Sequence, residues 1–358
     1  MKTIDLYIIR KFLGTFFYAI TLLILIVIVF DFSERIDDFI DGNAPVKGII
    51  FDYYLNFIPY FVNLFSPLFT FIAVIYFTSR MANNSEFLAI LSSGVNLGRI
   101  LLPYMISALV ISLLSLYLNN YVIPHSNQKR HNFEYTFLKN PWRFVDRHIH
   151  IQLDKNVFAY FESYNNEYNT GNRFALEQFQ DGELRSKLLA DVIRWDSVKG
   201  LWQVENYYIR QINGTGEIIT RGEKMDTALN LVPKDFGRKV ESVETMNINE
   251  LNRFIENETV KGSMNIPYYL IEKHRRFSFP AATIILTIIG LSIASRKVRG
   301  GTGLHLGMGL LIAFAYILFM QISTTFATNA NLSPALAVWI PNFLYLIFAL
   351  FLFRAAPQ

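Results

Sequence analysis

Long unbroken runs of apolar residues dominate the chain and are separated by polar stretches. A helix rises about 1.5 Å per residue, so roughly 20 apolar residues cross the ~30 Å hydrocarbon core of a bilayer. Six runs approach or meet this length: Phe12–Phe30, Phe57–Thr78, Ile100–Leu118, Phe277–Ala294, Leu304–Thr325 and Pro334–Phe353. The pattern therefore predicts six transmembrane helices in two groups of three.

The interval between the third and fourth runs, residues 119–276, contains no candidate span. Its apolar positions recur in short alternating or mixed stretches, which are typical of strands. These stretches are His148–Leu153, Val157–Phe161, Phe174–Phe179, Leu188–Trp195, Trp202–Ile212 and Glu217–Thr220. Turn signals such as Asp181-Gly182 and Lys199-Gly200 separate them. We expect a sandwich, jelly roll or open barrel, followed by a helix at Asn247–Glu258.

The predicted fold class is a membrane α + β protein with six transmembrane helices, three on each side of an inserted, extracytoplasmic β-jellyroll-like domain. The predicted domains are residues 1–124 with the first three helices, residues 125–265 with the β domain, and residues 266–358 with the last three helices. In the second run, Pro59 and Asn63 indicate a kinked helix that faces protein rather than lipid.

Lysine and arginine gather in one set of short loops, which indicates the orientation of the chain. With the N-terminus in the cytoplasm, that side receives most of the basic loop residues: Lys2, Arg10, Lys11, Arg80, Arg99, Arg296, Lys297, Arg299 and Arg354. Both termini and the 81–99 segment are then cytoplasmic, and the β domain lies outside. The basic group Lys273, Arg275 and Arg276 breaks the rule, because it precedes the fourth helix at its outer end.

Composition agrees with this class and excludes several others. Hydrophobic residues make up 52% of the 358 positions and charged residues only 17%, which is too apolar for a protein dissolved in water. The zero cysteine count excludes disulfides and thiolate metal sites. A net charge of +4 without a long basic stripe predicts no nucleic-acid partner.

The chain carries no motif for nucleotide hydrolysis or covalent catalysis. A phosphate-binding GxxxxGK[ST] sequence is absent, and the glycines between positions 300 and 309 lack its lysine. Neither a GxSxG elbow nor an HExxH pair occurs. His148 and His150 would share a strand face, but no carboxylate accompanies them at a suggestive spacing. We predict no catalytic residue, no metal, no cofactor and no enzymatic activity.

The segment between the second and third runs has residues that favour the start and the end of a short helix, which we predict over residues 81–94. Asn84 or Ser85 can cap it, Glu86 suits the positive end of the helix dipole, and Gly94 can end it. Its apolar side chains fall on one stripe: Phe87, Ile90 and Leu91. The stripe either lies against the protein's own helices or docks into a cytoplasmic subunit.

Motifs in both halves of the chain occur in a characteristic order. They are Ser66–Ala73, Ser85–Gly94, Asn119–Pro124, Arg276–Pro280, Arg296–Gly301 and Trp339–Asn342. Together they resemble the permease family that exports lipopolysaccharide from the bacterial inner membrane, over essentially the whole chain. The segments Asp31–Asp37 and Trp202–Asn206 make the chain more similar to the G-type than to the F-type permease of that family.

The resemblance implies a set of partners. In this family two paralogous permeases pair around a central cavity, sit on a cytoplasmic homodimeric ATPase, and carry periplasmic β-jellyroll domains that pass lipid to a periplasmic bridge protein. It implies a non-catalytic inner-membrane subunit that moves lipopolysaccharide. The first external loop is acidic where better-known members carry lysines, so lysine-based phosphate recognition does not transfer to that loop.

Three groups of candidate site residues follow. The short helix would couple the permease to the ATPase through Ser85, Glu86, Phe87, Ile90, Leu91 and Gly94. A basic rim at the outer surface would bind lipid phosphate or merely snorkel to the headgroups: Arg35, Lys47, Lys273, Arg275 and Arg276. Acyl chains would pass Phe158 and Tyr160, which we expect to point into an open apolar lumen rather than a closed sandwich core.

Two other classes of function stay open at this level. A membrane-anchored enzyme acting on lipid or cell wall needs titratable groups that converge inside the bilayer, where ionisable residues are costly. Asp52 is the only notable candidate. A sensor with an outer β domain needs a cytoplasmic output domain, but the cytoplasmic pieces are short loops. Co-purification of a cytoplasmic ATPase would separate the three classes.

Overall fold

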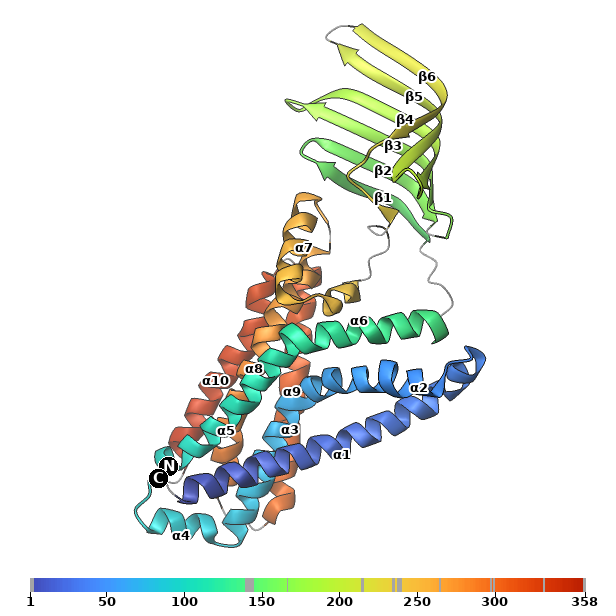
Figure 1. Cartoon of the computed structure of the whole chain (residues 1–358). Helices are drawn as coiled ribbons and strands as arrows, with labels where there is room; N and C mark the ends of the chain where they lie inside the picture. Colours follow the sequence, from blue (N-terminus) through green and yellow to red (C-terminus); the bar gives the residue numbers. More distant parts are fainter. Residues whose placement is uncertain are drawn as a thin grey trace. The chain divides into compact units, whose positions relative to one another are not determined.

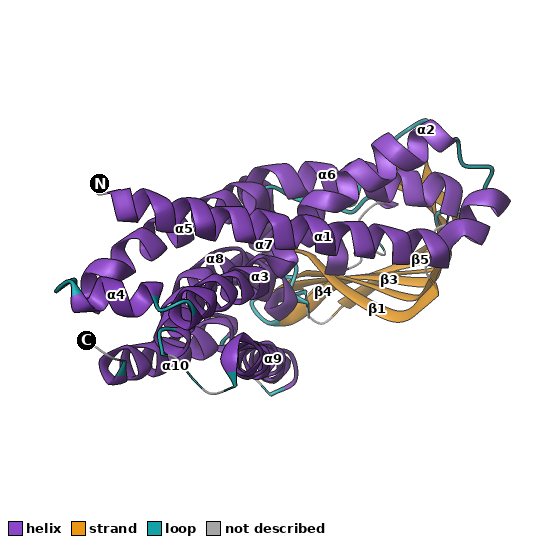
Figure 2. Cartoon of the chain, turned by 90° about the horizontal axis from the view of Figure 1, so that it is seen from below, coloured by secondary structure: helices purple, strands orange, loops and turns teal. Residues whose placement is uncertain are grey.

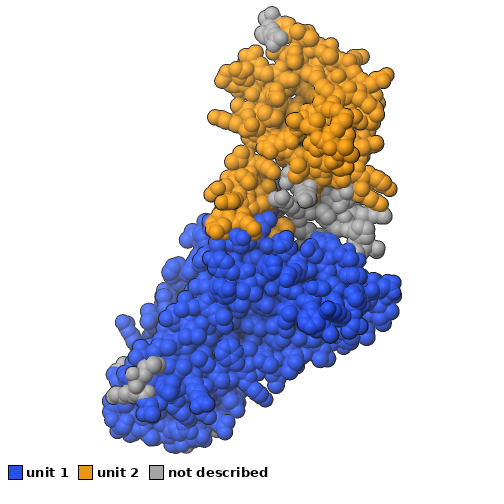
Figure 3. All heavy atoms as spheres, viewed as in Figure 1, with its two compact units in different colours: residues 1–138, 243–248, 267–358 blue, residues 139–242, 249–266 orange. Residues whose placement is uncertain are grey.

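A computed structural model of the chain describes residues 3–138, 145–165, 167–213, 216–233, 236, 240–263, 265–296, 298, 300–330 and 332–356. The chain divides into two compact units (Figure 3). The helical unit comprises Met1–Leu138, Val243–Ile248 and Pro267–Gln358. The β unit comprises Lys139–Ser242 and Asn249–Ile266.

Six long helices account for the six apolar runs (Figure 1). Their bounds are α1 Thr3–Asp41, α3 Leu55–Asn83, α5 Leu97–Tyr117, α8 Ile266–Ala294, α9 Gly301–Asn329 and α10 Pro334–Ala355. Each is long and apolar enough to cross a bilayer. The predicted fold class is thereby confirmed in its three-plus-three helices and in the β-sheet inserted between the third and fourth of them.

Shorter helical elements extend or connect the long ones. They are α2 Val46–Gly48, the π-helical η1 Ile49–Tyr54, α4 Glu86–Ser92, the π-helical η2 Leu118–Val122, α6 Ile123–Phe133, the π-helical η3 Glu134–Leu138, the 3₁₀ turn η5 Val240–Thr245 and α7 Ile248–Val260. Two views agree that both termini and α4 lie at one end of the helical unit (Figure 1, Figure 2). We call this the terminal end.

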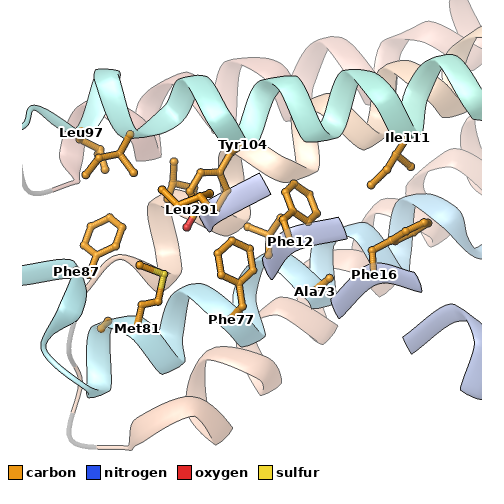
Figure 4. Packing of buried hydrophobic residues seen from close by; sticks show 14 of the residues in the cluster. Phe12, Phe16, Ala73, Phe77, Met81, Phe87, Leu97, Tyr104, Ile111 and Leu291 are labelled. Carbon is orange, nitrogen blue, oxygen red and sulfur yellow. The ribbon is translucent and has the colours of Figure 1, made fainter. Parts of the chain in front are cut away.

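The core at the terminal end joins the first three long helices (Figure 4). In α1 the buried side chains recur every fourth residue and form one narrow stripe: Ile8, Phe12, Phe16, Ile20 and Ile24. Phe12 lies 5.8 Å from Phe77 of α3 and 6.1 Å from Tyr104 of α5, measured between ring centroids. A single stripe leaves the other faces of α1 exposed to whatever surrounds the chain.

An aromatic cluster packs the opposite end of the same helices. It contains Phe39 of α1, Tyr53 and Tyr54 of η1, Phe57 of α3 and Phe133 of α6. Both tyrosine hydroxyls donate to the carboxylate of Asp31, at 3.0 and 3.1 Å. The α1 helix therefore continues past the apolar run and is fixed there by aromatic packing and charge-assisted hydrogen bonds.

Six antiparallel strands build the β unit. Their bounds are β1 Val145–Asp154, β2 Val157–Asn165, β3 Thr170–Gln180, β4 Glu183–Asp196, β5 Leu201–Asn213 and β6 Gly216–Thr227. Neighbours in the sheet follow sequence order. Each strand pairs with its neighbour in sequence. The described strands therefore form a single meander.

One face of this sheet carries the core of the β unit. Phe161, Phe174, Trp202 and Val204 are fully buried there. The segment after β6 covers them, because Phe236 stacks on Tyr164 with 3.7 Å between centroids. The Trp202 indole donates to the carbonyl oxygen of Leu231 at 2.7 Å. On this face the described residues form a closed core.

A bend crosses the whole sheet along one row of residues. His148, Arg173 and Asn206, in β1, β3 and β5, have φ values of 57°, 47° and 51°. The paired register skips this row between every pair of strands. Across this row the core positions step by three residues instead of two, as from Phe161 to Tyr164. We call this row the bend row.

Candidate functional site

Arg276, one of the predicted lipid-binding residues, is buried and held by contacts within its own chain. It is 2% exposed, and its guanidinium contacts Glu272 one turn earlier at 3.1 Å. It also donates to the backbone carbonyls of Met246 and Val243, at 2.9 and 3.0 Å. Arg276 therefore fastens the η5 segment to α8, and three of its five N–H donors are engaged within the chain.

The neighbouring Arg275 has a different environment. It is only partly buried, and its guanidinium lies over the ring of Phe279 with 5.9 Å to the centroid. Its Nε is buried and has no hydrogen-bond partner among the described residues. A buried donor without a partner costs about 1–3 kcal/mol, so an anion that reached Arg275 would gain a strong charge-assisted hydrogen bond.

Two cavities in the helical unit meet at Arg275. One, of about 50 Å³, is polar and is lined by Tyr60, Asn63, Asn127, Glu244 and Glu272 among others. The other, of about 320 Å³, lies between α3, α8 and α9 and is almost wholly apolar, lined for example by Phe65, Leu68, Phe279, Tyr316 and Ile317. A cation between a polar and an apolar cavity is suited to an amphiphile with an anionic head.

Sequence reasoning missed two charged residues beside this place. The guanidinium of Arg130 on α6 lies 5.6 Å from the ring centroid of Tyr60. Burial raises the pKa of Glu244 in η5, and the nearby carboxylate of Glu272 adds to the rise, whereas Arg130 and Arg275 oppose it. The run Lys129-Arg130-His131, which follows the third apolar run in the sequence, is a second basic group and could have indicated this place.

Arg35 and Lys47, two further predicted members of the rim, do not line either cavity. Arg35 lies 4.0 Å from the Glu134 carboxylate, which Arg130 approaches at 3.7 Å. The Nε of Arg35 contacts Asp31 at 3.2 Å, and its guanidinium lies 5.6 Å from the ring centroid of Tyr53. Arg35 therefore belongs to the aromatic cluster. Lys47, on α2, is exposed. Lys273 is partly buried on α8. No single rim unites the five predicted residues.

The stripe on α4 turns toward the bundle. Phe87 is 1% exposed and packs with Met81 and Leu97 (Figure 4). Ile90 and Leu91 also pack, partly buried, against that core. The exposed face of α4 is a different one, where Leu88 is 63% exposed and is followed by Ala89 and Ser92. Because α4 has only seven residues and one face packs on the core, the face with Leu88 is the one it exposes.

The ends of α4 differ from the expected capping. Ser85 has a left-handed backbone with φ of 63° and makes no side-chain capping bond. Asn84 donates instead to the Glu86 carboxylate at 3.2 Å. Gly94 has φ of 84°, as expected for a glycine that ends a helix. Two left-handed residues thus set α4 apart from α3 and α5.

Phe158 and Tyr160 lie on the open face of the sheet, opposite to its closed core. Strand alternation turns their neighbours Ala159 and Phe161 into that core, so Phe158 and Tyr160 do not belong to it. They line a cavity of about 530 Å³ together with Ala175, Leu189 and other side chains. The Phe158 side chain is 39% exposed there.

The remaining candidates carry no catalytic arrangement. The Nδ1 atom of His148 lies 2.9 Å from the hydroxyl of Tyr160, and the His150 ring lies 4.7 Å from the Tyr160 ring. Among the described residues, no group of three or more histidine and carboxylate side chains could hold a metal. Asp52 is exposed and does not converge with other titratable groups inside the helical unit.

Comparison with known proteins places these features in context. The family described as lipopolysaccharide export system permease LptF/LptG matches residues 6–355. A protein of Aquifex aeolicus (strain VF5), described as uncharacterized, is 22% identical over 364 residues. That similarity spans 97% of this chain and 96% of the relative. Both matches run through the helices and the inserted sheet alike.

Proposed function

This chain belongs to the LptF/LptG family of lipopolysaccharide export permeases, and from that premise we propose that it is a transmembrane subunit of an ATP-driven exporter. It would extract lipopolysaccharide from the bacterial inner membrane and pass it to a periplasmic bridge protein. A homodimeric cytoplasmic ATPase would supply the energy, and a paralogous permease would complete the transport path. Of the two permease types, we propose the G-type.

The single observation that carries this proposal is the pair of cavities that meet at Arg275. An exported lipid must leave the bilayer, and each methylene exposed to water costs about 0.8 kcal/mol. The apolar cavity of about 320 Å³ offers shelter to an acyl chain. The unpartnered Nε of Arg275 at its edge offers a donor to a phosphate. Both halves of an anionic lipid therefore find complementary surroundings.

The proposed orientation places the terminal end in the cytoplasm, as the loop charges indicate. The ATPase would then dock against the exposed face of α4, centred on Leu88. Ser85, Glu86 and Gly94 would set the position of this face, whereas Phe87, Ile90 and Leu91 anchor α4 to its own bundle. An exposed leucine on a short helix is suited to a hydrophobic pocket of a partner.

The β unit would continue the path on its open face. Phe158 and Tyr160 line the cavity of about 530 Å³ there, beside the apolar Ala175 and Leu189. These side chains can cover part of an acyl chain, whereas the opposite face is closed by Leu231 and Phe236. Photo-crosslinkers at positions 158 and 160 should trap lipid in an ATP-dependent way, and crosslinkers at position 161 should trap only protein.

The test of the lipid site compares two neighbouring substitutions. Arg275→Gln should lower the lipopolysaccharide that co-purifies with the complex by about tenfold, because a charge-assisted hydrogen bond is lost. Lys273→Gln, two residues earlier on the same helix, removes a positive charge that lines neither cavity. It therefore serves as the matched control and should leave lipid recovery unchanged. Equal lipid recovery in both variants would contradict the assignment of Arg275.

The test of the docking face also uses a neighbouring pair. Leu88→Asp should abolish recovery of the ATPase while the permease inserts and folds, since only an exposed contact is changed. Phe87→Asp should reduce the amount of folded permease itself, because it places an unpaired carboxylate in the core. Normal ATPase recovery with folded Leu88→Asp permease would exclude this face of α4.

A further inference from the structure

Two polar contacts tie α1 to the first residue of α4 and to the start of α5, the helix that follows α4. The hydroxyl of Tyr7 donates to Oε2 of Glu86, the first residue of α4, at 3.1 Å. The guanidinium of Arg99, near the start of α5, donates to both carboxylate oxygens of Asp5, at 2.9 and 2.7 Å. Asp5 and Tyr7 belong to the same turn of α1, so one turn of α1 contacts both flanks of α4.

The ion pair between Asp5 and Arg99 holds the start of α1 firmly against the start of α5. The Asp5 carboxylate is 3% exposed, and the bidentate pair with Arg99 fixes orientation as well as distance. Separating an ion pair at a buried carboxylate is strongly unfavourable. A displacement of this junction therefore moves both partners together more readily than it separates them.

The backbone changes direction at both ends of α4. Left-handed residues bound it, Ser85 before it and Gly94 after it, with φ of 63° and 84°. The end of α3 is fastened elsewhere, because Ser79 bonds His305 of α9 at 2.8 Å and Asn83 donates to Thr302 at 3.0 Å. The hydrogen bond from α4 itself, at Glu86, runs to α1, whereas the end of α3 is tied to α9.

We propose that Asp5 and Tyr7 are positioning residues that transmit the displacement of α4 to α1. This inference rests on the proposed function, in which an ATPase pushes on α4. The α1 helix is suited to move together with α4, because only one narrow stripe of α1 is buried. Movement at its terminal end would be carried along 39 residues of continuous helix to the far side of the membrane.

The experiment uses the whole complex and measures lipid release per ATP hydrolysed. Tyr7→Phe removes one hydroxyl, and Asp5→Asn removes the charge while keeping the shape of the side chain. In the double variant, lipid release per ATP should fall by about tenfold, within the range typical of coupling between two sites. ATPase recovery and the rate of ATP hydrolysis should stay at the wild-type level. Arg10→Gln, an exposed change on the same helix, is the matched control.

A distance measurement separates transmission from simple stabilisation. The chain lacks cysteine, so spin labels can be attached at single new cysteines replacing the exposed Leu6 of α1 and Ser92 of α4. In the otherwise unchanged chain the distance between the labels should be the same with and without ATP, because α1 follows α4. In the Asp5→Asn, Tyr7→Phe variant it should change with ATP.

Three results would overturn the inference. Normal lipid release per ATP in the double variant would show that the two residues do not transmit the stroke. A label distance that changes with ATP in the otherwise unchanged chain would show that α1 does not follow α4. Failure of the unsubstituted chain to recover any ATPase would overturn the proposed function, and this inference with it.

Discussion

The helices α8 and α1 are both long and apolar, yet they occupy opposite positions in the helical unit. In the most apolar window of α8, 67% of the residues are buried, against 22% in α1. About half of the buried residues of α8 are small, such as Ala282, Thr283 and Thr287, and small residues allow helices to approach closely. The difference teaches that α8 is the fixed centre of the unit and α1 a helix held on one side.

Hydrogen bonds strengthen this contrast. Asn342 of α10 donates to the hydroxyl and the carbonyl oxygen of Ser278 of α8, at 2.8 and 3.1 Å. It also accepts from the hydroxyl of Tyr316 of α9 at 2.8 Å. Three helices therefore meet at one buried amide. The α1 helix instead has its polar contacts near its two ends, at Asp5 and Asp31.

The largest expected effect comes from adding volume to the fixed centre. A Cβ at Gly290 of α8 would lie 2.9 Å from Val74 and 3.1 Å from Phe71. Gly290→Leu should therefore lower the free energy of unfolding by about 3 kcal/mol. Gly14→Leu in α1, where nothing lies within 4 Å, should change it little. Thermal unfolding of the detergent-solubilised chain measures both, and equal losses would remove the contrast between the helices.

The second largest effect is expected where α1 meets the aromatic cluster. Asp31→Ala removes the acceptor of Tyr53 and Tyr54, and should cost about 2 kcal/mol because the lost hydrogen bonds are charge-assisted. Asp37→Ala, exposed on the same helix, is the control. Hydrogen exchange should rise in residues 31–41 and remain slow in α8. A rise in α8 as well would show that the two helices are not independent.

A smaller effect is expected from the buried amide that joins α8, α9 and α10. Asn342→Leu leaves the hydroxyls of Ser278 and Tyr316 without their partner. Hydrogen bonds between helices in membranes contribute about 1 kcal/mol or less, so the loss should be well below that of Gly290→Leu. A loss as large as that of Gly290→Leu would mean that polar contacts rather than close packing fix the position of α8.

The smallest effect concerns Glu244, and its sign depends on pH. Burial, with help from Glu272, raises the pKa of Glu244 above its ordinary value of 4.5. The folded state therefore favours the protonated form, and ionisation at higher pH opposes folding. Glu244→Gln should raise the unfolding temperature at pH 8, and the gain should shrink as the pH falls toward 4.5. A gain that is constant with pH would exclude the carboxylate as its cause.

The elements themselves were largely predictable from the sequence. Each of the six apolar runs lies within or nearly within a long helix, and the predicted stretch Trp202–Ile212 lies within β5. The helix expected at Asn247–Glu258 is α7, Ile248–Val260. These patterns are local, because the periods of helices and strands depend only on neighbouring residues. The turn at Asp181-Gly182 was likewise read correctly, since both residues have positive φ.

The partners of each side chain were not predictable in the same way. The stripe with Phe87 could pack against its own bundle or another subunit, and only the fold decides between these. Arg275 and Arg276 are adjacent in sequence, yet only Arg276 meets the carbonyls of the distant η5 segment. For Phe158 and Tyr160, alternation separates two faces but does not say which face is covered. The covering Phe236 comes from a separate segment of the chain.

The bend row places a limit on how the β domain can change in length. Because residues such as Arg173 and Asn206 lie in one row across the sheet, a single inserted residue in any strand would move its bend out of line and turn the residues beyond it to the opposite face. Insertions and deletions should therefore be confined to hairpins, such as those at Asp181-Gly182 and Lys199-Gly200. The same two hairpins are the places to insert an epitope tag.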